Sequence, residues 1–551
     1  MKGEVIMSTI NTKRVLTATQ AKAAEISHTN FMGGTSYDIK SPLLKLICMS
    51  SSSFFGEPMY YKDQFPSGHK VKHSGSWGCG GRLSSSKIGY IRKTLNAIDD
   101  YEWRNLSPAS SIEKAIDEAL IFNPEATLKW ATILRREENI RVTPQVILVR
   151  AANNPKLKGT GLVRKYAPGI IGRTDEPATQ MAYQLSAFGK PIPNSLRRSW
   201  ADNLSKANEY SLAKYKMESR GVKTVDVANM AFGKGFYGYQ TPIGKLMRGE
   251  LVLGGDSKTW ESIRSGGGSW EEAVEVMGHM ALLRNIRNLV EAKTPPKLWV
   301  PKLVETAKGG KQLPFRYLSA YNMNKAAPGY VLDAIEQCLS ISLDALPKLP
   351  GRSLILSDNS GSTRSTPISE LSTMNIAQIG NLMGVLTGMI SEEGILGVFG
   401  DQIDYLNIRK SASIMDQTNK ATSMGGKVGQ GTENGVWLAL DKAIKNKEHF
   451  DNIFVYSDQQ AGHGGLYGIN QRSYSNYVFP GSSRYIDVAK MISDYRNKVN
   501  RKVNVFMVQI AGYEDTLLPE FYERTYILGG WSGSILKFAR RMIDVGDQYF
   551  K

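Results

Sequence analysis

The alternation of apolar strands with helices in residues 350–545 constrains the fold more than any other feature of this sequence. The expected strands are 353–357, 395–400, 403–408, 452–457, 503–510 and 525–528, and the expected helices are 370–390, 434–446, 484–499 and 532–545. Strands that alternate with helices predict a mainly parallel, doubly wound α/β sheet. Ligands of such sheets bind at the carboxyl ends of the strands.

Oxygen-bearing side chains stand at two of these strand ends and in a glycine-rich loop between them. They are Asp358, Ser360, Ser362, Thr432 and Asp458. Carboxylates and hydroxyls are hard ligands that suit Mg²⁺ or another divalent cation, which prefers octahedral oxygen and retains water molecules. In the competing interpretation, the Ser-Gly-Ser segment is a plain turn and the Asp side chains cap helices. A vestigial or purely structural metal site is a third alternative.

Residues before 346 have a different pattern, in which helices follow one another without strands. A polar tail is expected at 1–30. The expected helices are 112–120, 125–137, 145–152, 178–188, 194–203, 205–219, 224–232, 256–264 and 269–290. Short Pro, Asn or Gly turns join them, which favours an all-α array of stacked helical repeats. The segment LPKLPG at 346–351 marks a boundary, so the expected domains are a tail (1–30), a helical domain (31–345) and a sheet domain (346–551).

The composition is that of a globular protein of several domains. The chain has 551 residues, 41% hydrophobic and 22% charged, and it contains no apolar run long enough to span a bilayer. The first residues lack the apolar core of a secretory signal. Three cysteines, Cys48, Cys79 and Cys338, are too few and too far apart for a disulfide framework, which predicts a reducing, cytoplasmic location.

Basic charge is concentrated in the helical part. Residues 1–350 contain 48 Lys and Arg against 31 Asp and Glu, whereas residues 351–551 contain 21 against 20. A local surplus of this kind attracts polyanions, most simply nucleic acid, although a generally solvated basic surface would have the same composition. The candidate RNA-binding residues are Arg197, Arg198, Lys214, Lys216, Arg220, Lys223, Arg284 and Arg287.

Aromatic residues interleave with these cations. Trp200, Tyr210 and Tyr215 are candidates for stacking on unpaired bases, and the alternative is that they form the core of the repeats. Arg284 has two interpretations as well: it contacts RNA together with Arg287, or it holds a buried carboxylate.

Two family resemblances follow from these motifs. The series D-x-S-x-S, Thr432 and Asp458 resembles the metal-ion-dependent adhesion site of von Willebrand factor A domains. The stretches FMGGTSY (31–37), FFGEPMYY (54–61), PNSLRR (193–198), MALLRN (280–285) and PFRYLSAY (314–321) resemble the TROVE module, named for telomerase, Ro and vault proteins. A TROVE module followed by an A domain is the layout of Ro ribonucleoproteins.

The resemblance implies a ring of HEAT-like helical repeats closed by the A domain. It also implies a non-enzymatic scaffold that binds small noncoding Y-like RNA on its outer surface and single-stranded RNA ends in its central hole. Tethering of that RNA to an exoribonuclease or another protein belongs to the same hypothesis. The alternative function is a protein–protein adaptor, in which the metal of the A domain captures an acidic ligand. A phosphotransfer enzyme is disfavoured, because the sequence has no nucleotide-binding loop or second acidic metal cluster.

Overall fold

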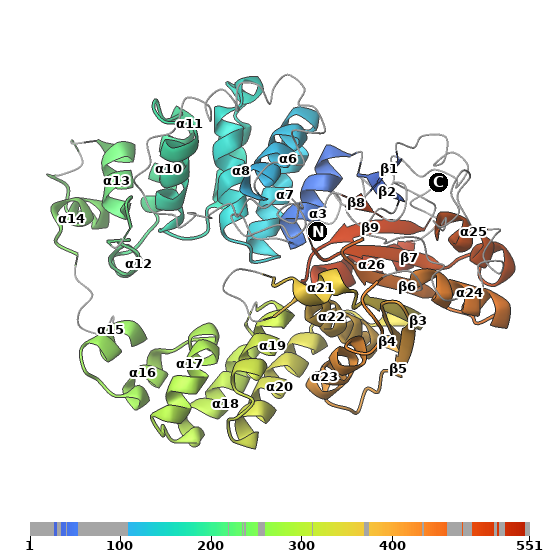
Figure 1. Ribbon diagram of the computed structural model, residues 1–551. Coiled ribbons are helices and arrows are strands. Elements are labelled where there is room, and N and C mark those ends of the chain that lie inside the picture. The colour runs from blue at the N-terminus through green and yellow to red at the C-terminus, as the bar shows by residue number, and fades with distance from the viewer. Residues whose placement is uncertain are drawn as a thin grey trace, which may run out of the picture. The chain divides into compact units, whose positions relative to one another are not determined.

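The computed structural model (Figure 1) describes residues 27–29, 35–39, 41–52, 108–218, 220–233, 235, 238–251, 259–310, 312–368, 374–431, 435–459, 477, 488–511, 515–516 and 524–545. These residues divide between two compact units. The helical unit comprises the described residues from 108 to 277, and the sheet unit comprises those of 27–52 and 278–545. The domain boundary expected at 346 stays a prediction; the central strand of the sheet unit begins close by, at Leu349.

The described part of the helical unit contains helices only. They are α6 (Pro108–Phe122), α7 (Pro124–Arg136), α8 (Val142–Asn153), the 3₁₀ helix η1 (Pro155–Leu157), α9 (Leu162–Ile170), α10 (Glu176–Ala187), α11 (Asn194–Leu204), α12 (Glu209–Lys214), α13 (Thr224–Phe232), α14 (Pro242–Arg248), α15 (Trp260–Ser265) and α16 (Trp270–Val276). Helices close in sequence pack together, as α7 does with α8 and α9, and α11 with α13. The expected all-α array is therefore confirmed, and its closure into a ring stays a prediction.

Local signals explain where several of these helices begin and end. The Asn123 side chain caps α7 by accepting a hydrogen bond from the Ala126 amide at 3.0 Å, and Pro124 occupies the first turn. The helix expected at 205–219 is wrong in extent. It stops at Lys214, because the Tyr215 carbonyl accepts the Thr224 hydroxyl and Met217 takes a positive φ of 59°.

The helix expected at 269–290 is likewise interrupted, at Met277 and Gly278. Both residues are extended, with ψ angles of 130° and 174°, so α16 ends and a separate helix begins at His279. One continuous apolar periodicity therefore covers two helices that belong to different compact units.

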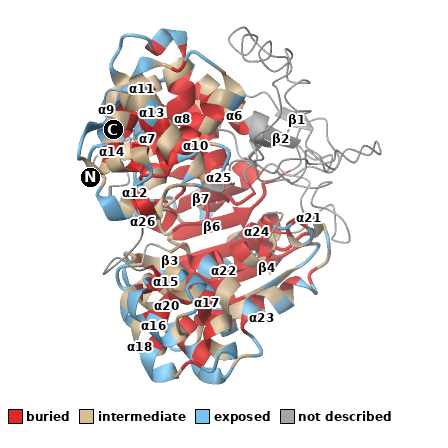
Figure 2. Cartoon of the chain, turned by 90° about the vertical axis from the view of Figure 1, so that its left-hand side faces the viewer, coloured by how far each residue is buried: buried red, intermediate tan, exposed pale blue. Residues whose placement is uncertain are grey.

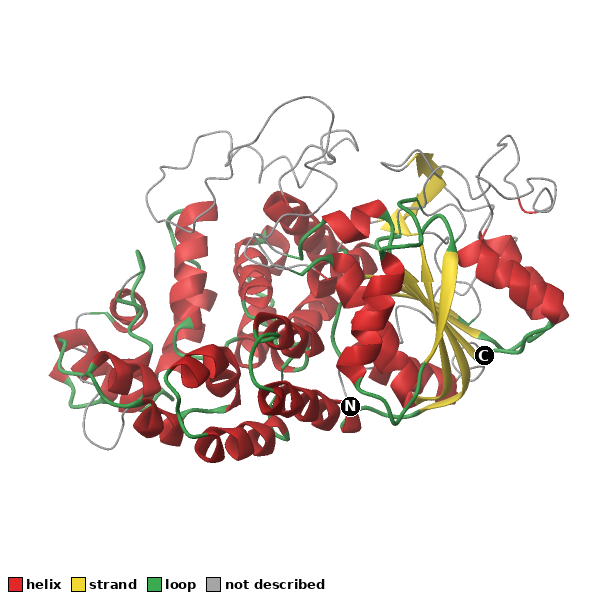
Figure 3. Ribbon diagram, turned by 60° about the horizontal axis from the view of Figure 1, so that its bottom comes forward, coloured by secondary structure: helices red, strands yellow, loops and turns green. Residues whose placement is uncertain are grey.

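The sheet unit contains the remaining elements. They are β1 (Ser27–Thr29), β2 (Thr35–Asp38), α3 (Pro42–Ser52), α17 (His279–Glu291), α18 (Pro296–Ala307), α19 (Pro314–Met323), α20 (Gly329–Asp344), β3 (Leu349–Asp358), α21 (Gly361–Ser365), α22 (Ile376–Ile390), β4 (Ser391–Phe399), β5 (Ile403–Asn407), α23 (Ile414–Gly425), α24 (Val436–Asn446), β6 (Asn452–Ser457), α25 (Val488–Lys498), β7 (Asn504–Gln509), β8 (Asp515–Thr516), β9 (Thr525–Gly529) and α26 (Ser534–Val545). Six strands form one sheet in the order β5-β4-β3-β6-β7-β9, drawn in yellow in Figure 3. Only β5 is antiparallel to its neighbour, so the expected mainly parallel sheet is confirmed.

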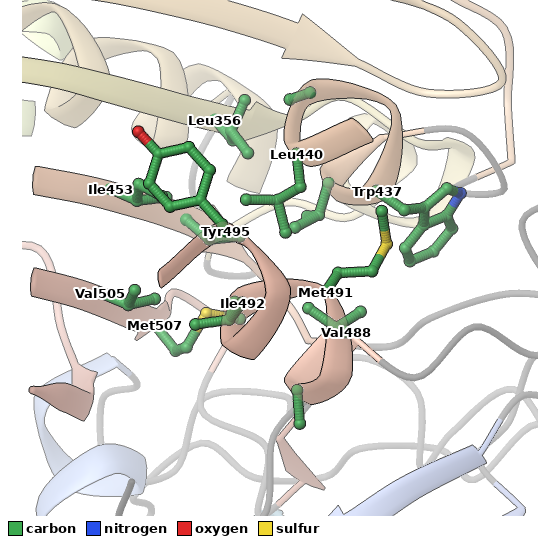
Figure 4. Close-up of a cluster of buried hydrophobic side chains, with 14 of the residues drawn as sticks. Leu356, Trp437, Leu440, Ile453, Val488, Met491, Ile492, Tyr495, Val505 and Met507 are labelled. Atoms are coloured by element: carbon green, nitrogen blue, oxygen red, sulfur yellow. The ribbon is translucent and has the colours of Figure 1, made fainter. Parts of the chain in front are cut away.

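Helices cover both faces of this sheet. On one face α24 and α25 pack against alternate residues of the central strands, and Figure 4 shows the cluster, which includes Leu356, Ile453, Val505, Trp437 and Tyr495. On the other face the rings of Phe454, Phe506 and Tyr526 stack in a row, with centroids 4.6 Å and 5.1 Å apart. Strands β6 and β7 are buried along their whole length (red in Figure 2), as parallel strands between two helical layers must be.

Helix α22 lies against the second face through glycines spaced four residues apart. A Cβ at Gly384 would stand 2.8 Å from Leu396, and a Cβ at Gly394 in β4 would stand 2.4 Å from the Cα of Gly388. The backbones of α22 and β4 therefore approach closely, at positions where any larger residue would push the two elements apart.

The N-terminal segment belongs to the sheet unit, which the sequence did not indicate. Strand β2 pairs with β8, and Leu44 and Cys48 of α3 are part of the core cluster over the sheet. A Cβ at Gly529 would stand 2.4 Å from the Cα of Cys48. Cys48 and Cys338 are buried free thiols, and Cys79 lies outside the described residues. None of the described helices has the length and apolar character that crossing a bilayer requires.

Candidate metal centre and nucleic-acid interface

The candidate metal centre lies at the carboxyl ends of β3 and β6. These strands are parallel neighbours in which Ser357 is opposite Tyr456, so the residues that follow them emerge side by side. Asp358 is the last residue of β3, and Asp458 directly follows β6. The hydroxyl of Ser457 donates a hydrogen bond of 2.6 Å to Oδ2 of Asp358, which joins the two strand ends.

Four of the five predicted ligands form one connected group. The Ser360 amide donates to Oδ1 of Asp358 at 2.9 Å, and the hydroxyls of Ser360 and Ser362 are 3.0 Å apart. The Ser362 hydroxyl in turn donates to Oδ2 of Asp458 at 2.9 Å. The fifth residue, Thr432, lies outside the described residues. The arrangement thus brings two carboxylates and two hydroxyls to one place, as the pattern predicted.

Both carboxylates of this centre are buried. Asp358 is 0% exposed and Asp458 is 1% exposed. Burial raises the pKa of Asp358, and the hydrogen bonds from Ser457 and Ser360 offset only part of that shift. Within the described ranges, no salt bridge reaches Asp358. Burying two acids that are linked through the Ser360 and Ser362 hydroxyls is more favourable when a cation neutralises them, so this donor set fits a divalent ion.

The ligand chemistry also selects among cations. Among the residues that the structure describes, no three His, Cys, Asp or Glu side chains gather as they would around zinc. Two carboxylates with hydroxyls instead match the hard-oxygen preference of Mg²⁺, which binds few protein ligands and keeps several waters.

The loop that leads to Thr432 is held against the centre by two charged residues. The Asp401 carboxylate accepts the amides of Gln430 and Gly431 at 2.9 and 2.7 Å, and Arg364 donates to the Gly429 carbonyl at 2.6 Å. Gly429 has φ +92°, and a Cβ there would stand 2.1 Å from the Asp401 carboxylate, so this position requires glycine.

This loop also contacts the turn of residues 360–362 that follows β3, since the Gly361 amide donates to the Gln430 carbonyl at 2.6 Å. Residues 429–431 therefore lie beside Ser360 and Ser362. Sequence reasoning missed Asp401 and Arg364, because neither belongs to the ligand pattern and their partners are backbone groups far along the chain.

A buried amide pair supports the turn after β3. Asn359 and Asn381 each donate a side-chain N–H to the other's carbonyl oxygen at 2.9 Å, and Ser357 adds a bond of 2.8 Å to Asn381. The packing is tight, because a Cβ at Gly425 would stand 2.1 Å from the Asn359 side chain. These contacts hold the backbone from which Ser360 and Ser362 project.

The predicted RNA-binding cations of the helical unit lie on and between α11, α12 and α13. Arg198, Arg220 and Lys223 are exposed, whereas Arg197 is half-buried and donates to the Met230 carbonyl at 3.1 Å. Lys216 is half-buried and pairs with Glu218 at 3.7 Å. Arg198, Arg220 and Lys223 are thus the members of the set best placed for phosphate contacts.

Of the two interpretations of Trp200, core of the repeats is confirmed and base stacking is wrong. Its side chain is 0% exposed, and its indole N–H donates to Oε1 of Gln180 at 2.7 Å inside the helical unit. Burying this large ring stabilises the repeats and leaves no face for a base. Tyr210, by contrast, is 38% exposed, and Tyr215 is half-buried.

Arg284 and Arg287 belong to the sheet unit and lie on α17, where both are exposed. Arg287 pairs with Glu291 at 3.6 Å. Arg284 forms no salt bridge with any described residue, so the interpretation in which it holds a buried carboxylate finds no support. Its charge instead acts on Arg316, whose pKa is lowered first by burial and then by Arg284.

No protein-family model and no curated protein sequence matches this chain. The structure is similar to the crystal structure of the Deinococcus radiodurans Ro (RSR) protein, with a TM-score of 0.55 and 13% sequence identity. The similarity covers 91% of this chain and 99% of that one. The von Willebrand A assignment of the sheet remains a prediction. The helical array and the mixed sheet that follows it together have the fold of a Ro protein over nearly the whole chain.

Proposed function

We propose that this protein is an RNA-binding scaffold of the Ro ribonucleoprotein type and that it is not an enzyme. The fold shared with a Ro protein over 91% of the chain carries the proposal. A second support is the charge distribution, because residues 1–350 contain 48 Lys and Arg against 31 Asp and Glu. The proposed ligands are small noncoding Y-like RNA and single-stranded RNA ends. One role of the scaffold would be to tether the bound RNA to an exoribonuclease. The buried free thiols of Cys48 and Cys338 agree with a cytoplasmic location.

Electrostatic contact with phosphates is the physical basis of this binding. Arg198, Arg220 and Lys223 are exposed cations, and each phosphate they neutralise would release counterions. Affinity for RNA should therefore fall steeply as the salt concentration rises.

A charge-reversal variant tests the proposal. In the purified full chain, Arg198, Lys214, Arg220 and Lys223 are changed to Glu together, and the affinity for a small structured RNA with a single-stranded end is measured over a range of salt concentrations. The slope of log affinity against log salt should decrease by about 3, since four phosphate contacts are lost.

A matched control carries the same change in net charge on the sheet unit. Lys410, Lys420, Lys447 and Lys502 are exposed there, and their change to Glu should leave RNA affinity within about twofold. Failure of the wild-type protein to bind RNA in a salt-sensitive way would refute the proposed function.

The buried oxygen cluster supports a second candidate function, the protein–protein adaptor. Asp358, Ser360, Ser362 and Asp458 would hold a divalent cation whose open position takes a carboxylate from an acidic partner. Asp358→Ala should abolish binding of an acidic peptide in Mg²⁺ and leave RNA affinity unchanged. Equal peptide binding with and without a chelator would exclude this candidate.

A further inference from the structure

A series of cation–aromatic contacts links α12 and Tyr215, the residue that follows it, to Arg173, which precedes α10. The guanidinium carbon of Arg173 lies 4.3 Å from the ring centroid of Tyr215. The ammonium nitrogen of Lys214 lies 5.7 Å from the same ring and 5.6 Å from that of Tyr210. All three distances are within the range of cation–π attraction. Arg141, Arg173, Tyr210, Lys214 and Tyr215 are named the Tyr210 patch from here on.

One buried carboxylate orients the two arginines of the patch. Asp175 accepts both Nε and Nη2 of Arg173, at 3.0 and 2.9 Å, and Nη2 of Arg141 at 3.1 Å. Two of the three cations of the patch thus share a single acid. Lys214 has no salt bridge with any residue in the described ranges, and the neighbouring Glu209 is paired with Lys245 at 2.6 Å. The patch therefore retains an excess of two positive charges.

The backbone under the patch is fixed. The Asn208 side chain caps α12 through the Ser211 amide at 2.8 Å, and the Thr174 hydroxyl donates to the Ser211 carbonyl at 3.3 Å. The buried Thr224 donates to the Tyr215 carbonyl. Because these bonds and the Asp175 pairing already order the side chains, a ligand would pay little conformational entropy to use them.

Rings and cations that alternate at these distances suit a ligand in which flat bases alternate with phosphates. Aromatic rings stack on bases of any sequence, and arginine and lysine neutralise the phosphates between them. Only unpaired nucleotides expose a base face to a side chain, because neighbouring base pairs cover those faces in a duplex. An acidic peptide would match the charge but would make no use of the exposed Tyr210 ring.

We propose that the Tyr210 patch is a binding site for single-stranded RNA. Tyr210 stacks on a base, and Arg141, Arg173 and Lys214 neutralise the adjacent phosphates. The assignment rests on the proposed RNA-binding function and makes it specific, because it names which ligand form binds here and adds Arg141 and Arg173 to the residues expected from the sequence.

The test compares Tyr210→Leu with Tyr330→Leu in the full chain. Both tyrosines are partly exposed, 38% and 39%, but Tyr330 lies on α20 of the sheet unit, outside the patch. The probes are a fluorescent oligouridylate of about twelve nucleotides and a blunt RNA duplex of similar length. Tyr210→Leu should weaken oligouridylate binding by about 5- to 150-fold with little effect on the duplex, and Tyr330→Leu should change neither.

A second variant, Lys214→Met, tests the phosphate contact independently of the ring. It should reduce the salt dependence of oligouridylate binding by about 0.7 in the slope of the log–log plot. Thermal unfolding of each variant checks that the fold is retained.

The outcomes separate the two proposals. If wild-type protein binds neither probe nor structured RNA, both the proposed function and the Tyr210 patch are refuted. If wild-type protein binds RNA but Tyr210→Leu behaves like Tyr330→Leu, the patch is refuted and the function stands. An equal loss on single-stranded and duplex probes would also overturn the patch, since stacking requires unpaired bases.

Discussion

The Ser362 hydroxyl donates a 2.9 Å hydrogen bond to Oδ2 of Asp458, although 96 positions separate the two residues in the sequence. The contact exists because β3 and β6 are parallel neighbours, and the turns that follow them lie at the same edge of the sheet. The Asp458 carboxylate and the Ser362 hydroxyl are far apart in the sequence, but the fold places them in one oxygen-lined centre.

The first prediction concerns Asp358 and pH. Burial raises the pKa of Asp358 above its usual 3.8, so ionisation of this side chain costs stability in the metal-free fold. The cost is absent at low pH, appears as pH rises through 3.8, and is complete above the raised pKa. Asp358→Asn should remove it, so the variant should be more stable than wild type in chelator at neutral pH and no more stable at pH below about 3.8.

Urea unfolding across pH, with chelator and with Mg²⁺, measures both effects. Mg²⁺ should stabilise the wild-type protein by mass action and leave Asp358→Asn unchanged. Equal stabilisation of the two proteins by Mg²⁺ would show that the ion binds elsewhere.

The second prediction concerns the loop that contains residues 429–431. Asp401→Asn weakens the acceptor for the Gln430 and Gly431 amides, so the loop should move away from the turn of residues 360–362. The affinity for Mg²⁺ should then fall by about tenfold. Asp404→Asn in the same hairpin is the matched control, because among the described residues that exposed carboxylate accepts only the amide of its neighbour Tyr405. Displacement of Mn²⁺ by Mg²⁺, followed by paramagnetic resonance, compares the two. Indistinguishable affinities would mean that Asp401 does not position the centre.

The third prediction concerns Arg150, which joins three helices in the interior of the helical unit. Its guanidinium, 1% exposed, pairs with Asp117 and lies 3.6 Å from Glu113, and it donates to the Tyr183 hydroxyl at 2.7 Å. Arg150→Met would leave two acids without their partner and should lower the free energy of unfolding by about 3–5 kcal/mol. The exposed Arg198→Met should cost less than about 0.5 kcal/mol. Chemical denaturation measures both; similar values would contradict the structural role of Arg150.

The fourth prediction concerns the close approach of β4 and α22. A methyl group at Gly394 would meet the backbone of Gly388 at 2.4 Å, which neither element can relieve by rotating a side chain. Gly394→Ala should therefore destabilise the protein by about 1–3 kcal/mol. Gly309→Ala, where nothing lies within 4 Å of the new Cβ, is the control and should be neutral. The thermal unfolding midpoints of the two variants measure this difference, and equal midpoints would contradict the prediction.

Strongly patterned segments were predictable. Strand β6 and helix α13 have the bounds expected from sequence, since a continuous apolar run predicts a buried parallel strand and an apolar stripe predicts a packed helix. The proximity of Asp358, Ser360, Ser362 and Asp458 was predictable for a related reason: polar residues that directly follow buried strands of a parallel sheet lie at one edge. Thr432, outside the described residues, stays a prediction.

Elements that depend on distant partners were not predictable. Helix α3 packs on β9, and β2 pairs with β8, although several hundred positions lie between them in the sequence. The residues next to Trp200 in the sequence do not show whether its ring is exposed or buried. Only its hydrogen bond to Gln180 and its complete burial show that it belongs to the core.

The sequence by itself determined that a helical part is followed by a part in which strands alternate with helices. It also determined that oxygen-bearing side chains stand at the strand ends, because hydrophobic periodicity and strand termini are local properties. Tertiary structure alone decided that the N-terminal segment packs on the sheet unit, that Asp401 holds the loop of residues 429–431, and that the Tyr215 ring contacts both Arg173 and Lys214. Those contacts join residues whose separation along the chain conceals them, and the chain can form them only once the surrounding helices and strands have packed.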